Sequence, residues 1–234
     1  MPNAIISGAT QGIGKAIAEK LLSEGFNVAI CARTAADLEA VKEQWNKEYP
    51  EATVITYKAD LSVKQEAQDF AAHVLATFKE IEILVNNAGM FFPGNLMDEP
   101  DGHLENLMGI NMYSAYYLTR AVVPAIVKHG KGYIVNMCSV ASLKAYPQGG
   151  AYGISKYALL GFTENIRQEL MGDGIRVTAV CHGATISRSW EGAGIDPDRM
   201  MNAEDIADMV WAAYSLSPKA DVETLVMRPI KGDL

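Results

Sequence analysis

The stretch "NAIISGATQGIGKAIAEKLLSEG" at residues 3–25 combines a short apolar run, a glycine-rich turn and a longer segment whose apolar residues recur with helical spacing. The short run predicts a buried strand, and the longer segment predicts an amphipathic helix that stops at Gly25. This part of the chain is therefore interpreted as one strand–turn–helix unit.

The same alternation continues to the end of the chain. Further strands are predicted at 27–31, 53–59, 81–85, 132–138, 175–180 and 223–227, with helical patterns between them. Strands joined by helices of this length need crossover connections, so the sheet should be parallel and covered on both faces. We expect an α/β fold: a seven-stranded, doubly wound parallel sheet that forms one domain over residues 1–234.

Two helix starts carry capping signals. Thr34 is followed three residues later by Asp37, and Ser62 is followed by Gln65, a spacing typical of residues that cap a helix N-terminus.

Composition and charge exclude several classes of protein. The chain of 234 residues has a net charge of −8 and no long basic cluster, which disfavours binding to nucleic acid or to an anionic membrane. Apolar runs stay well below the length of a membrane span. The cysteines Cys31, Cys138 and Cys181 lie in apolar runs, which suggests neither disulfides nor a metal site. We expect a cytoplasmic protein without a metal.

Three irregular stretches, 90–102, 140–150 and 183–202, lie where ligands bind in open parallel sheets, beyond the carboxyl ends of strands. The last of them is predicted to form a partly mobile substrate loop, in which Trp190 either lines the pocket or only packs.

The glycine-rich turn is a candidate phosphate-binding loop. Gly8, Gly12 and Gly14 have the spacing G-x-x-x-G-x-G, which lets the backbone approach a pyrophosphate at the start of the next helix. Thr10, Gln11 and Ile13 belong to the same loop. The alternative is a tight turn that binds no ligand.

The end of the second strand favours NADP over NAD. Ala32 stands where a carboxylate would bind the ribose hydroxyls of NAD, and Arg33 offers a planar set of donors suited to a 2′-phosphate. Beyond the third strand, Asp60 and Leu61 are candidates to bracket the adenine ring, although Asp60 could equally be a turn residue.

The segment "YGISK" places Tyr152 and Lys156 four residues apart, on one face of a predicted helix. The spacing alone is weak evidence, because both residue types are common. Its context is stronger, since Ser139 ends the strand at 132–138 and "NNAG" at 86–89 follows another strand, both at the expected ligand edge.

Together with Asn111, these segments resemble the short-chain dehydrogenase/reductase family over essentially the whole chain, including 3-oxoacyl carrier-protein reductases and sepiapterin-type reductases of small ketones. The resemblance implies a single Rossmann-type domain that binds NADP(H). By the same resemblance, Tyr152 would be the general acid/base, Lys156 would hold the ribose, Ser139 would orient the carbonyl and Asn111 would complete a proton relay. The resemblance also implies that the cofactor is lined by Asn87, Ala88 and Gly89.

The chemistry agrees with these roles. Reducing a ketone needs a proton on oxygen, and a nearby ammonium should lower the pKa of the Tyr152 phenol towards neutral pH. Ser139 could hydrogen-bond the developing alkoxide.

One departure from the family pattern lies after the sixth strand. His182 stands where the family usually has proline, whereas Gly183 is retained and Thr185 can still reach the nicotinamide. His182 is either a secondary substrate or loop-positioning residue, or a tolerated substitution.

The sequence thus favours NADPH-dependent reduction of a ketone or 3-oxoacyl-type carbonyl. The alternatives are an alcohol or hydroxy-acid dehydrogenase working in the oxidative direction, and a non-catalytic dinucleotide sensor. The predicted long helices at 101–128 and 152–171 have additional apolar surface, which together with the resemblance indicates a homodimer or homotetramer.

Overall fold

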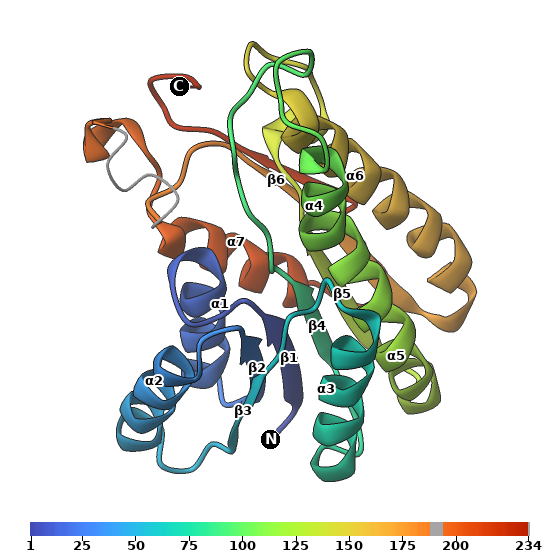
Figure 1. Cartoon of the computed structure of the whole chain (residues 1–234). Coiled ribbons are helices and arrows are strands. Elements are labelled where there is room, and N and C mark those ends of the chain that lie inside the picture. The colour runs from blue at the N-terminus through green and yellow to red at the C-terminus, as the bar shows by residue number, and fades with distance from the viewer. Residues whose placement is uncertain (188–193, 234) are drawn as a thin grey trace.

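The fold is a doubly wound Rossmann-type sheet, described by a computed structural model over residues 1–187 and 194–233. Seven parallel strands follow the spatial order β3-β2-β1-β4-β5-β6-β7, which confirms the predicted fold class (Figure 1). Their bounds are β1 Asn3–Ser7, β2 Asn27–Ala32, β3 Val54–Lys58, β4 Ile83–Asn86, β5 Gly132–Met137, β6 Ile175–His182 and β7 Thr224–Met227.

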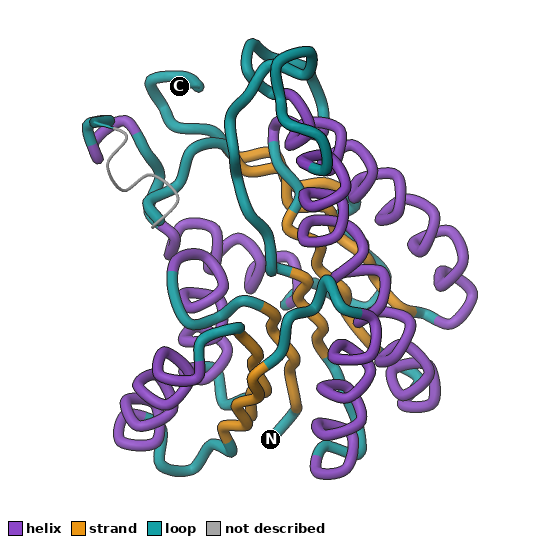
Figure 2. Tube along the Cα trace, in the orientation of Figure 1, coloured by secondary structure: helices purple, strands orange, loops and turns teal. Residues whose placement is uncertain are grey.

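Helices cover both faces of this sheet, as Figure 2 shows. On one face lie α1, α2 and α7, and on the other α3, α5 and α6, with short α4 leading into α5. Their bounds are α1 Gly12–Ser23, α2 Ala35–Glu48, α3 Lys64–Thr77, α4 His103–Met108, α5 Ser114–His129, α6 Gly150–Leu170 and α7 Ala203–Tyr214.

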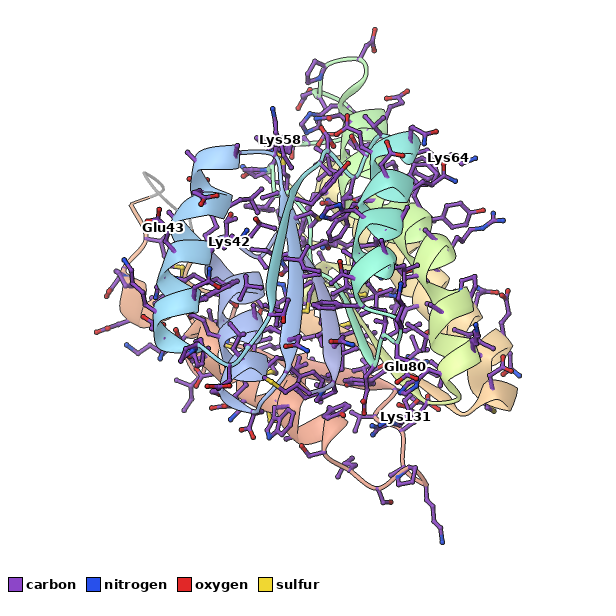
Figure 3. All side chains as sticks on the ribbon, turned by 90° about the horizontal axis from the view of Figure 1, so that it is seen from below. Lys42, Glu43, Lys58, Lys64, Glu80 and Lys131 are labelled. Atoms are coloured by element: carbon purple, nitrogen blue, oxygen red, sulfur yellow. The ribbon has the colours of Figure 1, made fainter. Side chains whose placement is uncertain are left out.

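Each face has its own apolar core. Trp45 and Ile206 are fully buried in the core under α1, α2 and α7, and Phe70 and Leu118 in the core under α3, α5 and α6. Figure 3 shows side chains filling the space between sheet and helices, with charged residues such as Glu43 on the outside. Because most strands are buried on both faces, their sequences are almost continuously apolar.

The prediction for the start of α3 is wrong. Val63, not Ser62, occupies the N-cap position, and the Ser62 hydroxyl instead donates to Asp60 Oδ1 at 2.6 Å. The helix begins at Lys64, one residue later than a Ser62 cap predicts. Thr34 does stand at the N-cap of α2, as predicted, but its side chain makes no capping hydrogen bond.

The predicted long helix at 101–128 is interrupted. A π-helical turn at Gly109–Tyr113 separates α4 from α5, and Asn111, which is 1% exposed, lies inside it. Such turns inside helices are frequent at functional sites, because they redirect a side chain out of the regular helical ladder.

The strand order places a topological switch point between β1 and β4. From β1 the chain winds outwards to β2 and β3, and from β4 it winds the other way, so loops diverge at this position and leave a crevice at the carboxyl ends. Among the described helices, none is both long and apolar enough to cross a bilayer. The three cysteines are buried and free.

Candidate active site

A large cavity of about 930 Å³ lies at this crevice. It is large enough for a cofactor together with a small substrate, since ligand pockets usually fall between about 300 and 1,000 Å³. The predicted site residues that line it are Gly8, Thr10, Gln11, Gly12, Ile13, Arg33, Asp60, Leu61, Asn87, Ala88, Gly89, Ser139, Tyr152, Lys156, Gly183 and Thr185. Two predicted residues, Gly14 and Asn111, do not line the cavity.

The glycine loop is built by close packing against Asn87. Gly8 and Gly12 have φ of 65° and 54°, the left-handed region that favours glycine. A Cβ on Gly14 would overlap the Asn87 amide, which donates to Ser7 O at 3.0 Å and Gly8 O at 2.9 Å. Gly14 therefore shapes the loop without lining the cavity.

The start of α1 is suited to an anion. Its N-cap residue, Gln11, makes no side-chain capping bond, and no acidic residue lies in the first turn. The first backbone N–H groups of a helix have no acceptor within the helix, and its dipole favours negative charge there. The loop thus fits the pyrophosphate of a dinucleotide.

The end of β2 presents the donors predicted for a 2′-phosphate. Arg33 is exposed at the cavity, and its Nη2 lies 3.6 Å from the thioether sulfur of Met90. Asp60 is a turn residue, because its carboxylate accepts from the Ser62 N–H at 3.0 Å as well as from the Ser62 hydroxyl. Leu61 is buried and lines the cavity beside it.

Tyr152, Lys156 and Ser139 come together deeper in the cavity. Tyr152 and Lys156 share one face of α6, and the Lys156 ammonium lies 5.8 Å from the centroid of the Tyr152 ring. That ammonium donates to Met137 O at 2.7 Å, at the end of β5. Ser139 follows β5, and its hydroxyl accepts from the Ala141 N–H at 3.1 Å and donates to His182 O at 3.5 Å.

The electrostatics of this group differ from the expectation. Burial raises the pKa of Tyr152, and the neighbouring Ser139 hydroxyl offsets this only in part. Burial likewise lowers the pKa of Lys156 to about 8. The prediction that Lys156 lowers the pKa of Tyr152 is therefore wrong for this structure, because removal of the phenol from water dominates. Tyr152 is protonated at neutral pH.

Asn111 connects two parts of the site. Its Oδ1 accepts from Met90 N at 2.7 Å, and its Nδ2 donates to Met90 O at 3.0 Å and to Ser155 Oγ at 2.9 Å. Ser155 in turn donates to Tyr152 O at 2.7 Å. Asn111 thus ties the segment after β4 to the helix that carries Tyr152.

The loop at 90–102 contributes two residues that the sequence did not reveal. Both carboxylate oxygens of Glu99 lie 3.1 Å from the Ala151 N–H, so Glu99 caps α6 next to Tyr152. The Phe91 ring meets the Tyr152 ring edge-on, with centroids 4.9 Å apart. Two glycines make room for Glu99, because a Cβ on Gly94 or on Gly150 would overlap its carboxylate.

The far end of the cavity is lined by Lys144, Arg228 and Asp233, which were also missed. Arg228 and Asp233 form an ion pair in the segment after β7. That segment packs on Gly183, where a Cβ would lie 3.0 Å from Pro229 Cδ. Gly183 and Pro229 are far apart in the sequence, so no local sequence pattern predicts this contact.

His182 lines the cavity beside Ser139. Its Nδ1 lies 2.9 Å from Gly183 O, and burial lowers the pKa of the ring to about 4. The imidazole is therefore neutral at physiological pH.

The substrate loop predicted at 183–202 is only partly described. Its two ends pair, because Ile186 N donates to Met201 O at 2.9 Å and Met201 N donates to Ala184 O at 3.0 Å. Ser187 and Ile195 line the cavity. Residues 188–193, including Trp190, lie outside the described residues.

A doubly wound sheet with an anion-binding glycine loop, and a Tyr-Lys-Ser group in the same cavity, defines a dinucleotide-dependent oxidoreductase. The chain belongs to the short-chain dehydrogenase family, whose model matches residues 2–196. As a member of this family it is an enzyme that acts on CH–OH or C=O groups.

Individual relatives agree with this assignment. The chain is 31% identical to a diacetyl reductase [(S)-acetoin forming] of Staphylococcus epidermidis, with 91% of this chain and 82% of that protein covered. It is 30% identical to a sepiapterin reductase of Chlorobaculum tepidum over 98% and 97% of the two chains. A metagenomic short-chain oxidoreductase, solved in complex with NADP, superposes with a TM-score of 0.83 at 31% identity, covering 97% of this chain and 96% of the other.

Proposed function

We propose that the protein is an NADPH-dependent carbonyl reductase in which Tyr152 donates the proton that completes reduction of a ketone or 3-oxoacyl-type substrate. The observation that carries this proposal is the buried, protonated Tyr152 phenol beside Ser139 and Lys156. A phenol in this state is an available acid at neutral pH and a reluctant base.

The cofactor-binding half of the cavity fits NADP(H). The glycine loop and the uncapped start of α1 would hold the pyrophosphate, Arg33 would bind the 2′-phosphate, and Leu61 would contact the adenine. Asn87, Ala88 and Gly89 line the nicotinamide half with Gly183 and Thr185. NADP in the related metagenomic enzyme supports this choice. When bound, the reduced nicotinamide supplies a hydride to the carbonyl carbon.

The chain's own residues carry the other half of the reaction. Ser139 donates a hydrogen bond to the substrate oxygen and holds the carbonyl next to Tyr152. As negative charge develops on that oxygen, the Tyr152 O–H bond breaks and the proton forms the new hydroxyl group. Lys156 holds the cofactor ribose, and its ammonium stabilises the phenolate that remains until a proton from solvent replaces the one lost.

The raised pKa of Tyr152 also favours the reductive direction over the oxidative one. Oxidation of an alcohol would need the phenolate as base, and burial disfavours that form.

The assembly proposed for this enzyme is a homodimer or homotetramer formed through α5 and α6, in the cytoplasm. Tyr113, Ile154 and Tyr157 on or next to these helices are 43%, 40% and 45% exposed, although they are large and apolar. Such clustered exposure is typical of interfaces. A monomeric mass in solution scattering would contradict this assembly.

The function is tested by following NADPH oxidation with diketones, 3-oxoacyl thioesters and pterin carbonyls. We expect turnover of at least one small ketone, with NADPH preferred over NADH. Tight NADPH binding without turnover of any carbonyl would overturn the proposal and favour a dinucleotide sensor.

A further inference from the structure

His182 has a defined tautomer. Its Nδ1 lies 2.9 Å from the carbonyl oxygen of Gly183, and a carbonyl oxygen can only accept a hydrogen bond. The ring proton is therefore assigned to Nδ1, because the Thr185 hydroxyl, 3.5 Å from the same nitrogen, donates its own proton to Gly183 O. Since the imidazole is neutral, Nε2 carries none and is a hydrogen-bond acceptor.

This acceptor faces the cavity. His182 lines the cavity and is partly exposed, and among the described residues Nε2 makes no hydrogen bond. The same atom is not among the fully buried polar atoms that lack a partner. A ligand in the cavity can therefore reach it, and only a ligand that donates a hydrogen bond gains from doing so.

His182 is a direct neighbour of the residue that binds the substrate carbonyl. Ser139 Oγ lies 3.5 Å from His182 O, so the residue that holds the substrate carbonyl and the residue that carries the imidazole are side by side. A substrate donor attached close to the reacting carbonyl is therefore the one best placed to reach this residue.

The surrounding charges select the kind of donor. Lys156, Lys144 and Arg228 line the cavity, with Asp233 as the counter-charge to Arg228. A substrate ammonium would be repelled by these cations, whereas a hydroxyl would not. We propose that His182 Nε2 accepts a hydrogen bond from a hydroxyl on the carbon next to the reacting carbonyl, which makes the enzyme selective for α-hydroxyketones. This inference rests on the proposed carbonyl reductase function.

The substrate pair acetoin and butanone tests this selectivity, because the two ketones share one carbon skeleton and differ by that hydroxyl. For the wild-type enzyme we expect kcat/KM for acetoin to exceed that for butanone by about 10- to 100-fold. Butanone has no hydroxyl and would leave Nε2 without a hydrogen bond, and a loss of this kind usually has an effect of that size. A ratio near one would overturn the proposal.

Two variants at His182 distinguish a hydrogen bond to the substrate hydroxyl from structural support of the loop. His182→Asn keeps a donor for Gly183 O but has no atom at the Nε2 position, so the acetoin-to-butanone ratio should fall to within about threefold of one. His182→Gln can place its amide oxygen near that position and should recover part of the ratio. A ratio that is unchanged in His182→Asn, or lost equally in both variants, would contradict the assignment.

The tautomer can be read without turnover by ¹⁵N NMR of the histidine rings in the wild-type protein, with His182→Asn to assign the signal. We expect a neutral ring protonated on Nδ1. A ring protonated on Nε2 would overturn the inference while leaving the reductase proposal intact. Failure of the reductase proposal is separate, because it appears as absence of turnover with every ketone.

Discussion

The two ends of the cavity are built in different ways. The end proposed for the adenosine and pyrophosphate of the cofactor uses the glycine loop after β1 and the ends of β2 and β3, all within the first third of the chain. The substrate end joins distant segments: Glu99 bonds to Ala151, and the ion pair Arg228–Asp233 follows β7, whose chain packs on Gly183.

This difference separates binding of the cofactor, which is common to many enzymes, from selection of the substrate, which is specific to one. Strand ends and helix N-termini provide phosphate binding by backbone geometry, which is independent of the substrate. The substrate end depends on side chains such as His182 and Lys144, which can change without disturbing the sheet. The predictions below test whether the catalytic group, the cofactor end and the substrate end make separable contributions.

The largest effect is expected at the residue where both ends meet. Tyr152→Phe should lower kcat for ketone reduction by about 10²- to 10⁴-fold, because it removes the general acid. The Kd for NADPH should change by less than about threefold, since the phenol hydroxyl is not one of the charged contacts to phosphate. Single-turnover kinetics and fluorescence titration measure the two quantities. Weakened NADPH binding in step with the lost activity would place Tyr152 in cofactor binding instead.

The buried ammonium of Lys156 predicts a pH effect on stability. Its pKa is lowered from 10.5 to about 8, so between these values the folded protein binds fewer protons than the unfolded chain. Below pH 8 the buried Lys156 charge destabilises the folded protein to its full extent. The free energy of unfolding should therefore rise by up to about 3 kcal/mol as the pH increases from 8 to 10.5.

Denaturant unfolding of the ligand-free protein against Lys156→Met measures this contribution. The variant should lack the rise, whereas Lys144→Met, which removes an exposed lysine from the same cavity, should retain it. Parallel pH profiles for the wild type and Lys156→Met would show that the ammonium is not destabilised by burial.

At the cofactor end, Arg33→Leu should raise the Kd for NADPH by about 10- to 100-fold, as expected for loss of charge-assisted hydrogen bonds. The Kd for NADH should change little, because NADH has no 2′-phosphate. Fluorescence titration with both nucleotides measures the change. An equal loss of affinity for NADPH and NADH would mean that Arg33 does not bind the 2′-phosphate.

The smallest effect is expected at Glu99, which positions α6. Glu99→Ala removes the acceptor for Ala151 N–H, and loss of a helix cap costs about 1 kcal/mol of stability. We expect kcat to fall about three- to tenfold with little change in the KM for NADPH, and Glu99→Gln to restore most of it. Full activity in Glu99→Ala would show that the cap does not position Tyr152.

The fold and the cofactor end were predictable because local chemistry determines them. Apolar runs gave the strands, and the glycine spacing with Arg33 gave the candidate dinucleotide site. Three features were not. Ser62 donates to Asp60 and does not cap a helix. Asn111 lies in a π-helical turn, which the spacing of apolar residues does not predict. Glu99 bonds to the start of α6, 52 residues further along the chain. The pKa of Tyr152 was also mispredicted, because the degree of burial follows from packing of the whole site and not from its spacing to Lys156.

The proposed reaction depends on the protonation state of Tyr152, which a ¹³C NMR titration of ring-labelled tyrosine measures directly, with Tyr152→Phe to assign the resonance. The account predicts that the phenol stays protonated from neutral pH to beyond about pH 10, where an ordinary tyrosine ionises. Ionisation at or below neutral pH would contradict it.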